Sequence, residues 1–261
     1  MAVFLLCLWF FLLGAALGSF YNVVIDRLPE GRDVVRLRSS CSACNTQLGA
    51  ADMIPVFSFL FLRGRCRYCG TRLSPWYFIS ELTVGALFVT AFLKYAGDAD
   101  AIWLIGALYL WSLLFITGVM DAKTGMIMDL FPLLIGVGGL VFGLLSHRSL
   151  WQILLGAATG AALYGAVYLI ARAVLGREGL GLGDVFLMAG IGFWFSWGQM
   201  IIIAFLTAYV SLIFIAVKAI REKKLGLRSE LPLGPSICIA AWIMSLFGTE
   251  IVHGLRLLLR L

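Results

Sequence analysis

The sequence predicts an all-α polytopic membrane protein, and three observations lead to this fold class. Of the 261 residues, 62% are hydrophobic and 13% are charged, and the mean hydropathy is +0.99. These values exclude an ordinary soluble domain. Apolar runs of about 20 residues, the length that a spanning helix needs, recur along the chain. Only one long polar stretch, at about residues 26–75, interrupts them.

We expect about eight transmembrane helices, because each needs a predominantly apolar run of this length. They cover approximately residues 2–25, 76–93, 102–120, 130–146, 150–171, 185–196, 199–217 and 232–249. The first run has no basic start and exceeds the apolar core of a signal peptide, so we expect a permanent span. The polar stretch then forms an extramembrane loop between the first two spans.

The positions of lysine and arginine predict the orientation. The loops that follow the odd-numbered expected spans carry most of the 20 Lys and Arg residues. The positive-inside rule makes this side cytoplasmic, and an even number of spans then leaves both termini outside. The net charge of +6 reflects this asymmetry and an attraction to anionic membrane lipid, so we expect no nucleic-acid partner.

Two polar features lie within the first two expected spans. Gly18, Ser19 and Asn22 stand near the end of the first, where small residues indicate either close helix packing or part of a ligand site. Glu81 lies about one turn inside the second span, where an ionisable side chain either faces a polar cavity or reaches to the interface. The sequence leaves both questions open.

The extramembrane loop contains two CxxC pairs, CSAC at Cys41 and Cys44 and CRYC at Cys66 and Cys69. This spacing fits a tetrahedral four-thiolate zinc site, which leaves no open coordination position and is therefore structural. A loop this small has little core, so the metal would supply much of its folding free energy. Two disulfides or four free thiols are the alternatives, but a reducing cytoplasm favours Zn²⁺.

Two aspartates stand at the ends of expected spans on the cytoplasmic side. Asp121 closes the third span, and Asp184 follows the glycine-rich stretch EGLGLG and opens the sixth. Two neighbouring carboxylates hold one proton between them, so one can activate a water while the other polarises a carbonyl. The sequence therefore predicts Asp121 and Asp184 as an acid–base pair.

Structural roles are the alternative for each carboxylate. Asp184 is a good helix N-cap, although the preceding Gly179, Gly181 and Gly183 would let backbone approach closely and adopt positive φ. Asp129 can simply benefit from the helix dipole at the start of the fourth span. Asp121 lies at a helix C-terminus, where the dipole disfavours a negative charge, which makes a functional role more plausible.

Two other classes of protein would also use such features. A proton-coupled transporter carries intramembrane carboxylates, but it places them at mid-depth, whereas both aspartates here lie at one face. An assembly scaffold would use the metal loop for docking and the aspartates as caps. It would tolerate the loss of either carboxylate.

Motifs along nearly the whole chain are similar to one known family. They are GSFYNVVIDRLP, the two CxxC pairs, DMIP, LRGRCRYC and SPWYFISELT, followed by Asp121 with Asp129, GLGD at the second aspartate, and LPLGP. Together and in this order they resemble the type IV prepilin peptidases, the GxGD membrane aspartyl proteases of type IV pilus and type II secretion systems. A presenilin-like intramembrane protease lacks the tetracysteine loop.

The resemblance implies an endopeptidase of the bacterial inner membrane that faces the cytoplasm and removes prepilin or pseudopilin leaders after a glycine. It makes Asp121 and Asp184 catalytic and assigns zinc to the four cysteines. Many members also methylate the new N-terminus with S-adenosylmethionine. Residues 1–95 would then hold the zinc loop and the methyltransferase part, and residues 96–261 the peptidase core. A peptidase without methylation is the alternative.

The chain departs from the family pattern at three positions. Phe186 stands where the family usually has lysine, Met128 where it usually has proline, and Met53 where it usually has asparagine. Both carboxylates remain, so these departures bear on substrate preference or efficiency more than on the type of reaction.

Overall fold

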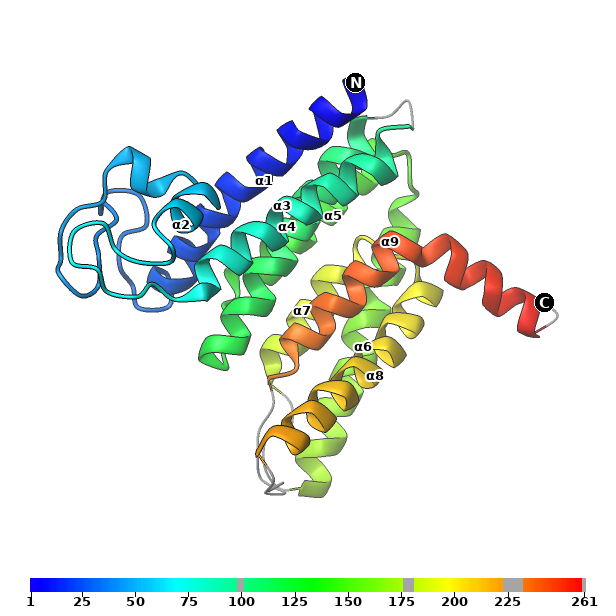
Figure 1. Ribbon diagram of the computed structural model, residues 1–261. Helices are drawn as coiled ribbons and strands as arrows, with labels where there is room; N and C mark the ends of the chain where they lie inside the picture. The colour runs from blue at the N-terminus through cyan, green and yellow to red at the C-terminus, as the bar shows by residue number, and fades with distance from the viewer. Residues whose placement is uncertain (98–100, 176–180, 223–231, 260–261) are drawn as a thin grey trace. The chain divides into compact units, whose positions relative to one another are not determined.

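The computed structural model describes residues 1–97, 101–175, 181–222 and 232–259, which form helices joined by loops. Within these residues the chain divides into two compact units, Met1–Leu104 and Ile105–Leu261, which we treat separately. The elements are α1 (Ala2–Arg27), η1 (Ala50–Met53), α2 (Phe57–Phe61), α3 (Pro75–Tyr95), α4 (Ala101–Thr124), α5 (Leu130–Leu145), α6 (Leu150–Leu175), α7 (Leu182–Gly192), α8 (Trp197–Glu222) and α9 (Gly234–Leu259) (Figure 1).

The all-α membrane class is confirmed. In the described part of the chain, six helices are long and apolar enough to cross a membrane, namely α1, α3, α4, α6, α8 and α9. The apolar helices α5 and α7 are shorter, so a total of eight spans stays a prediction. Helix α9 continues past the expected end at residue 249, with a non-helical break at Phe247 where its direction changes (Figure 1).

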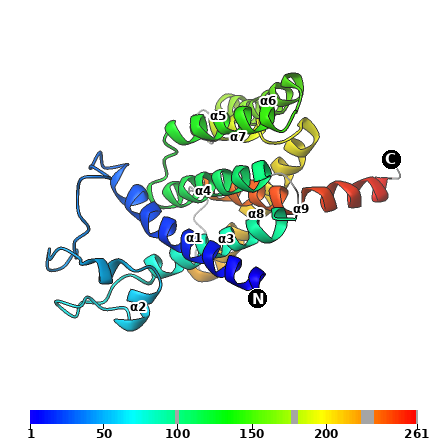
Figure 2. The same cartoon turned by 90° about the horizontal axis from the view of Figure 1, so that it is seen from above.

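In the first unit, α1 and α3 lie side by side (Figures 1 and 2). Glycines make this close contact possible. A Cβ on Gly14 would lie 2.8 Å from the carbonyl oxygen of Val84, and one on Gly18 would lie 3.1 Å from the Cα of Glu81. The close packing expected at Gly18 is therefore confirmed, because backbone meets backbone there.

Helix α3 begins at a clear start signal that follows the loop. The hydroxyl of Ser74 accepts a hydrogen bond from the Trp76 N–H at 3.3 Å, and Pro75 occupies the first helical position. Serine satisfies an otherwise unpaired N–H there, and proline has none to leave unpaired. The start of α3 fixes the position of Glu81, which lies less than two turns further on.

In the second unit, α5, α6 and α7 pack as one group (Figure 2). Helix α7 contacts both neighbours through glycine. A Cβ on Gly190 would lie 2.5 Å from the carbonyl oxygen of Pro132 on α5, and one on Gly192 would collide with the backbone of Gly156 on α6. Helix α8 packs against α6 and α9. Because α7 is held on two sides by backbone contacts, its first turn has a fixed place.

The turn that follows α7 is also tied down. The indole N–H of Trp194 donates to the carbonyl oxygen of Ile135 at 2.8 Å, and its ring stacks on Phe142. The Arg148 guanidinium donates to the carbonyl oxygens of Phe193 and Trp194 at 3.2 and 2.7 Å. A cation is favourable at the C-terminal end of a helix. The far end of α7 is thus anchored, opposite the end that carries Asp184.

Candidate functional site

Asp121 lies in the last turns of α4, which ends at Thr124 and is followed by Gly125. Gly125 adopts a positive φ of 66°, and its N–H donates to the carbonyl oxygen of Asp121 at 2.8 Å, which closes the helix. The Asp121 side chain is buried, with the residue only 4% exposed. Its Oδ2 accepts the backbone N–H of Gly234 at 2.9 Å.

Gly234 is the first residue of α9, so the N-terminus of that helix faces the carboxylate. The unpaired N–H groups and the dipole of a helix N-terminus favour a negative charge, which offsets the unfavourable end of α4. A Cβ on Gly234 would lie 2.5 Å from Oδ2 of Asp121, so glycine permits this approach. Sequence reasoning missed this role, although the Gly-Pro pair in LPLGP was a signal; Leu231 of that motif lies outside the described residues.

Asp184 lies in the first turn of α7, not at its N-cap. The expectation of a cap residue is wrong, because α7 begins at Leu182 and Gly181 is the N-cap. Asp184 and Gly181 exchange two hydrogen bonds, Gly181 N–H to Asp184 Oδ2 and Asp184 N–H to the Gly181 carbonyl, both at 3.2 Å. The carboxylate thus satisfies a helix-terminal N–H from inside the helix.

The glycines before Asp184 act differently from the expectation. Gly181 has a φ of −75°, and Gly183 is helical and is not among the positive-φ residues, so the expected positive φ is wrong for both. The expected close approach is confirmed at Gly183, where a Cβ would lie 3.0 Å from the Cβ of Ile127. Gly179, named with them, lies outside the described residues.

The structure brings the two aspartates together. Asp184 is 8% exposed and lies within electrostatic range of Asp121, and the charges of both act on the buried thiol of Cys238 in α9. Cys238 itself packs against Gly118 of α4. Three helices, α4, α7 and α9, therefore meet at a buried pair of carboxylates, an arrangement that can share one proton and carry out acid–base chemistry.

Other residues near these motifs lie outside the pair. Asp129 is exposed at the start of α5 and makes no capping hydrogen bond through its side chain. Phe186 is 54% exposed on α7, two residues after Asp184. Neither residue takes part in the contacts that hold Asp121 and Asp184.

The four loop cysteines come together in the first unit. The sulfur atoms of Cys41, Cys44, Cys66 and Cys69 all lie within 4.8 Å of one another, and all four are free thiols. The sulfurs of Cys41 and Cys69 are 3.9 Å apart. Sulfurs at ~2.3 Å from a tetrahedrally bound zinc ion are separated by roughly 3.8 Å. The cluster therefore fits a structural zinc ion.

The two cysteine pairs lie in turns of the same design, a repeat that sequence reasoning missed. The signal was present, since CSACNTQL at residues 41–48 aligns with CRYCGTRL at residues 66–73. Asn45 and Gly70 occupy the same place and have positive φ values of 53° and 70°. Their N–H groups donate to the carbonyl oxygens of Cys41 and Cys66 at 2.8 and 3.0 Å. We call these turns the two knuckles.

A threonine follows the second cysteine of each knuckle. The sulfurs of Cys44 and Cys69 lie 3.3 and 3.4 Å from the hydroxyls of Thr46 and Thr71. Hydrogen bonds from the side chain and backbone of Thr71 lower the pKa of the Cys69 thiol to about 6. The thiolate is the form that binds metal, so this sulfur is prepared for a cation at neutral pH.

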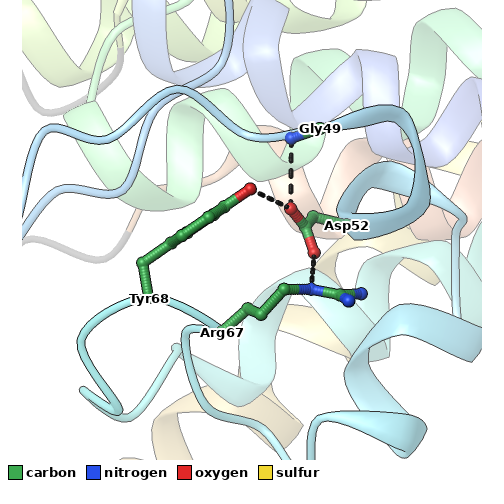
Figure 3. A network of polar contacts seen from close by, with 4 residues as sticks. All are labelled: Gly49, Asp52, Arg67 and Tyr68. Atoms are coloured by element: carbon green, nitrogen blue, oxygen red, sulfur yellow. Dashed lines mark hydrogen bonds and ion pairs between the residues drawn. The ribbon is translucent and has the colours of Figure 1, made fainter.

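Asp52 joins η1 to the second knuckle (Figure 3). Its carboxylate accepts the Gly49 N–H at 3.1 Å, the Tyr68 hydroxyl at 3.1 Å and the Arg67 Nε–H at 2.6 Å. Desolvation alone would raise the pKa of Asp52, but the hydrogen bonds from Arg67, Gly49 and Tyr68 outweigh it and hold the pKa below its usual range. Because Arg67 and Tyr68 are the middle residues of CRYC, Asp52 orients that knuckle.

Glu81 lies in a buried polar cluster between α1 and α3, where it also contacts the loop. It is 8% exposed, and its Oε2 accepts the N–H of Val56 at 2.7 Å. One residue earlier, the hydroxyl of Ser80 accepts a hydrogen bond from the Asn22 side chain at 2.6 Å. The loop, α1 and α3 therefore share one polar contact region.

Two regions of the chain match known protein families. Residues 12–95 match the Bacterial Peptidase A24 N-terminal domain, and residues 107–217 match the Type IV leader peptidase family. Three bacterial proteins, each called prepilin leader peptidase/N-methyltransferase, are similar over most of the chain. One from Klebsiella pneumoniae is 40% identical over 72% of this chain and 84% of its own length. One from Aeromonas hydrophila is 32% identical over 93% of this chain and 91% of its own length. One from Bacillus subtilis (strain 168) is 31% identical over 93% of this chain and 94% of its own length.

The chain belongs to the type IV leader peptidase family. Membership confirms the family resemblance and identifies the chain as a multi-pass membrane peptidase. The leader peptidase match contains Asp121 and Asp184, and the N-terminal match contains all four cysteines of the cluster. No solved structure matches the chain.

Proposed function

We propose that Asp121 and Asp184 are the catalytic pair with which this chain removes the leader peptide of type IV prepilins or pseudopilins after a glycine. The observation that carries the proposal is the pair itself, two buried carboxylates from α4 and α7 within electrostatic range of each other. The ionised carboxylate takes a proton from a bound water, and that water attacks the scissile carbonyl. The protonated carboxyl donates a hydrogen bond to the carbonyl oxygen and stabilises the developing charge.

The local structure supports an acid–base role for both carboxylates. Asp121 is oriented by the Gly234 N–H and Asp184 by the Gly181 N–H, so each carboxylate keeps one oxygen outside these bonds. Orientation of this kind holds reacting groups in place before the substrate arrives. A scissile peptide must be extended to expose its carbonyl.

The four cysteines would hold a structural zinc ion that joins the two knuckles. Four thiolates complete a tetrahedral site, so the ion would stabilise the loop and take no part in hydrolysis. The chain would then consist of residues 1–95, with the zinc loop and a methyltransferase part, and residues 96–261, the peptidase core.

A second activity is supported by the names of the relatives, which couple leader peptidase to N-methyltransferase. The chain would methylate the new N-terminal amine of its cleaved substrate and use S-adenosylmethionine as the methyl donor. Its N-terminal match covers the region to which this activity is assigned here.

The chain would lie in the bacterial inner membrane among lipids, with the catalytic pair on the cytoplasmic side and both termini outside. The excess of Lys and Arg in the loops on one side supports this orientation. Alkaline phosphatase fused to either terminus should be active, and a fluorescent protein fused there should be dark. The reverse pattern would contradict the orientation.

The catalytic pair is tested by cleavage of a prepilin that has glycine at its processing site. Membranes with the wild-type chain are compared with Asp121→Asn, Asp184→Asn and Asp129→Asn, in the presence of methyl-labelled S-adenosylmethionine. Loss of acid–base catalysis should reduce cleavage ~10²- to 10⁴-fold in the first two variants. Asp129→Asn is the matched control, because that side chain is exposed and makes no capping bond.

The two activities are read separately. Label on the cleaved product of the wild-type chain demonstrates methylation, and its absence supports a peptidase without this activity. Undiminished cleavage by Asp121→Asn or Asp184→Asn, with normal amounts of protein in the membrane, would rule out the proposed pair.

A further inference from the structure

The polar cluster between α1 and α3 contains a buried acceptor without a donor. Asn22 is 2% exposed, and its Nδ2 donates to the hydroxyl of Ser80, which itself donates to the carbonyl oxygen of Tyr77 at 2.8 Å. The other end of the amide, Oδ1 of Asn22, is buried and has no hydrogen-bond partner among the described residues. Buried oxygens are nearly always paired, so one that is not indicates a missing group.

A buried carboxylate lies beside this oxygen in the same helix contact. Glu81 follows Ser80 on α3, and the backbones of α1 and α3 approach closely where Gly18 meets Glu81. Glu81 accepts the N–H of Val56 and a hydrogen bond from the hydroxyl of Ser19, which is one helical turn from Asn22. Within the described residues no Lys, Arg or His lies within 4.0 Å of Glu81. A buried carboxylate normally has a cationic partner.

The Val56 contact is held by an unusual backbone. Val56 has φ 65° and ψ −53°, a region that β-branched residues rarely occupy, and it is 7% exposed. In this conformation its N–H is directed at Glu81. Strained residues of this kind persist where the surrounding structure holds them, frequently at ligand sites. The loop thus holds the Glu81 carboxylate in one orientation.

A line of polar groups leads from the cluster to the surface. One turn before Glu81, Tyr77 is 43% exposed, and its hydroxyl donates to Oδ2 of Asp26 at 3.2 Å. Asp26 lies one turn after Asn22 on α1. Two carboxylates and an amide oxygen therefore follow the α1–α3 contact inward from its exposed end, and of these three acceptors only the amide oxygen of Asn22 lacks a donor among the described residues.

We propose that the cluster of Asn22 and Glu81 binds the primary ammonium group of a ligand used in N-methylation. The inference rests on the proposed methyltransferase activity and deepens it. An ammonium group carries a positive charge and three N–H donors, which complement one carboxylate and one unpaired amide oxygen. Two ligands of that reaction carry such a group, the new N-terminus of the cleaved substrate and the methionyl part of S-adenosylmethionine.

The test measures binding to the purified full-length chain in detergent. The ligands are S-adenosylmethionine, a peptide with the sequence that follows the cleaved glycine, and the same peptide with an acetylated N-terminus. Glu81→Gln removes the charge but keeps an oxygen for the Val56 N–H, and Asn22→Leu removes the unpaired oxygen. Glu30→Gln is the matched control, since Glu30 is exposed and pairs with Arg32 on the surface.

Loss of a charge-assisted hydrogen bond should weaken binding by ~10- to 100-fold in Glu81→Gln. Weaker binding of the free-amine peptide, with unchanged S-adenosylmethionine binding, identifies the substrate amine as the ligand. The converse identifies the methyl donor. If the substrate amine is the ligand, the wild-type chain should bind the acetylated peptide as weakly as Glu81→Gln binds the free-amine peptide. If S-adenosylmethionine is the ligand, acetylation should not lower the wild-type affinity for the peptide in this way.

Stability provides a second readout that does not depend on Glu81→Gln folding. Asn22→Leu should weaken binding of the same ligand while leaving the thermal midpoint of the unliganded chain equal or higher, because it removes an unpaired buried oxygen. A purely structural Asn22 predicts the reverse, a lower midpoint with unchanged affinity, and would overturn the inference.

Failure of this inference can be told apart from failure of the proposed function. If the wild-type chain binds both ligands and both variants bind them as Glu30→Gln does, the ammonium site is wrong while methylation stands. If the wild-type chain binds neither ligand and transfers no label, the site and the methylation fall together. Prepilin cleavage should be the same in all four proteins, and this shows that the peptidase is intact.

Discussion

The same local turn positions an aspartate in each unit of the chain, with opposite surroundings. In the first unit Asp52 bonds back to the N–H of Gly49, and in the second Asp184 bonds back to the N–H of Gly181, in each case a glycine three residues earlier. Asp52 is also paired with Arg67. Asp184 has no cation at ion-pair distance in the described part of the chain and lies in range of a second carboxylate.

From this difference we infer that the turn only positions a carboxylate, whereas the neighbouring groups determine the role of that carboxylate. A cation and a phenol satisfy Asp52 and make it part of a scaffold. A like charge leaves Asp184 with a proton to share. The supports differ as well. The loop is built from short-range turns with exposed apolar side chains such as Phe61, whereas the aspartate pair depends on contacts between distant helices.

The largest effect should come from loss of the proposed zinc ion in the first unit. Cys66→Ser, or removal of zinc by a chelator, should reduce the zinc content from one to well under one per chain and unfold the loop, because structural zinc supplies ~10 kcal/mol or more in small domains. Metal analysis and limited proteolysis measure this. Cuts should appear between α1 and α3 only, and Cys7→Ser, in a span, is the control. Equal zinc in Cys66→Ser and the wild type would exclude the assigned site.

The second effect tests the support of the catalytic pair. In Gly234→Ala the new methyl group would lie 2.5 Å from Oδ2 of Asp121 and must displace it. A misplaced catalytic group costs about 10²-fold in rate, so prepilin cleavage should fall by that amount with zinc content unchanged. Gly254→Ala in the same helix has open space around it and should cleave normally. Full activity of Gly234→Ala would argue against the contact with Asp121.

A smaller effect should follow from packing in the second unit. Gly192→Ala places a methyl group against the backbone of Gly156 and 2.6 Å from the Cα of Ala157. Overpacking of this kind costs ~1–3 kcal/mol, so the thermal midpoint in detergent should fall. Gly198→Ala, with nothing within 4 Å of its Cβ, is the matched control and should unfold like the wild type. Equal midpoints would show that α6 and α7 are not in backbone contact.

The smallest effect should come from Asp52. Hydrogen bonds from Arg67, Gly49 and Tyr68 lower the pKa of Asp52 in the folded chain, so its charge stabilises the loop at neutral pH, and this contribution is lost only in acid, as the pH falls through the lowered pKa. At pH 7, Asp52→Asn should therefore weaken zinc retention by about 10-fold, as loss of a supporting residue does. Asp33→Asn, which loses a similar turn away from the cysteines, is the control.

Asp52→Asn also tests the comparison directly. It should leave prepilin cleavage unchanged, whereas Asp184→Asn should reduce it ~10²- to 10⁴-fold. A cleavage defect in Asp52→Asn with normal zinc content would show that the two aspartates are not opposites.

The sequence predicted the fold class, which is confirmed, and located both aspartates at helix ends, because local patterns of residues determine these features. An apolar run predicts a helix, and a carboxylate at the end of such a run can be recognised from the sequence alone. The repeat of the two knuckles was also local, and comparison of residues 41–48 with residues 66–73 would have revealed it.

Contacts between distant residues could not be predicted in this way. The bond from Gly234 to Asp121 and that from Val56 to Glu81 join segments far apart in the sequence. The start of α7 was also misplaced by a few residues. Asp184 lies inside the first turn and still accepts the hydrogen bond of a helix-terminal N–H, as a cap residue would, so the sequence does not distinguish the two positions.

The two knuckles together determine how the proposed zinc ion binds and dissociates. Each knuckle is closed by its own turn and presents two sulfurs, so the loop is a bivalent ligand whose two halves are joined by a tether, residues 49–65. Once one knuckle holds the ion, the other is present at an effective concentration on the order of millimolar. Release of the ion then requires both knuckles to dissociate from it before either one binds it again. The persistence of the metal is therefore set by the length of the tether as much as by the strength of any single zinc–sulfur bond.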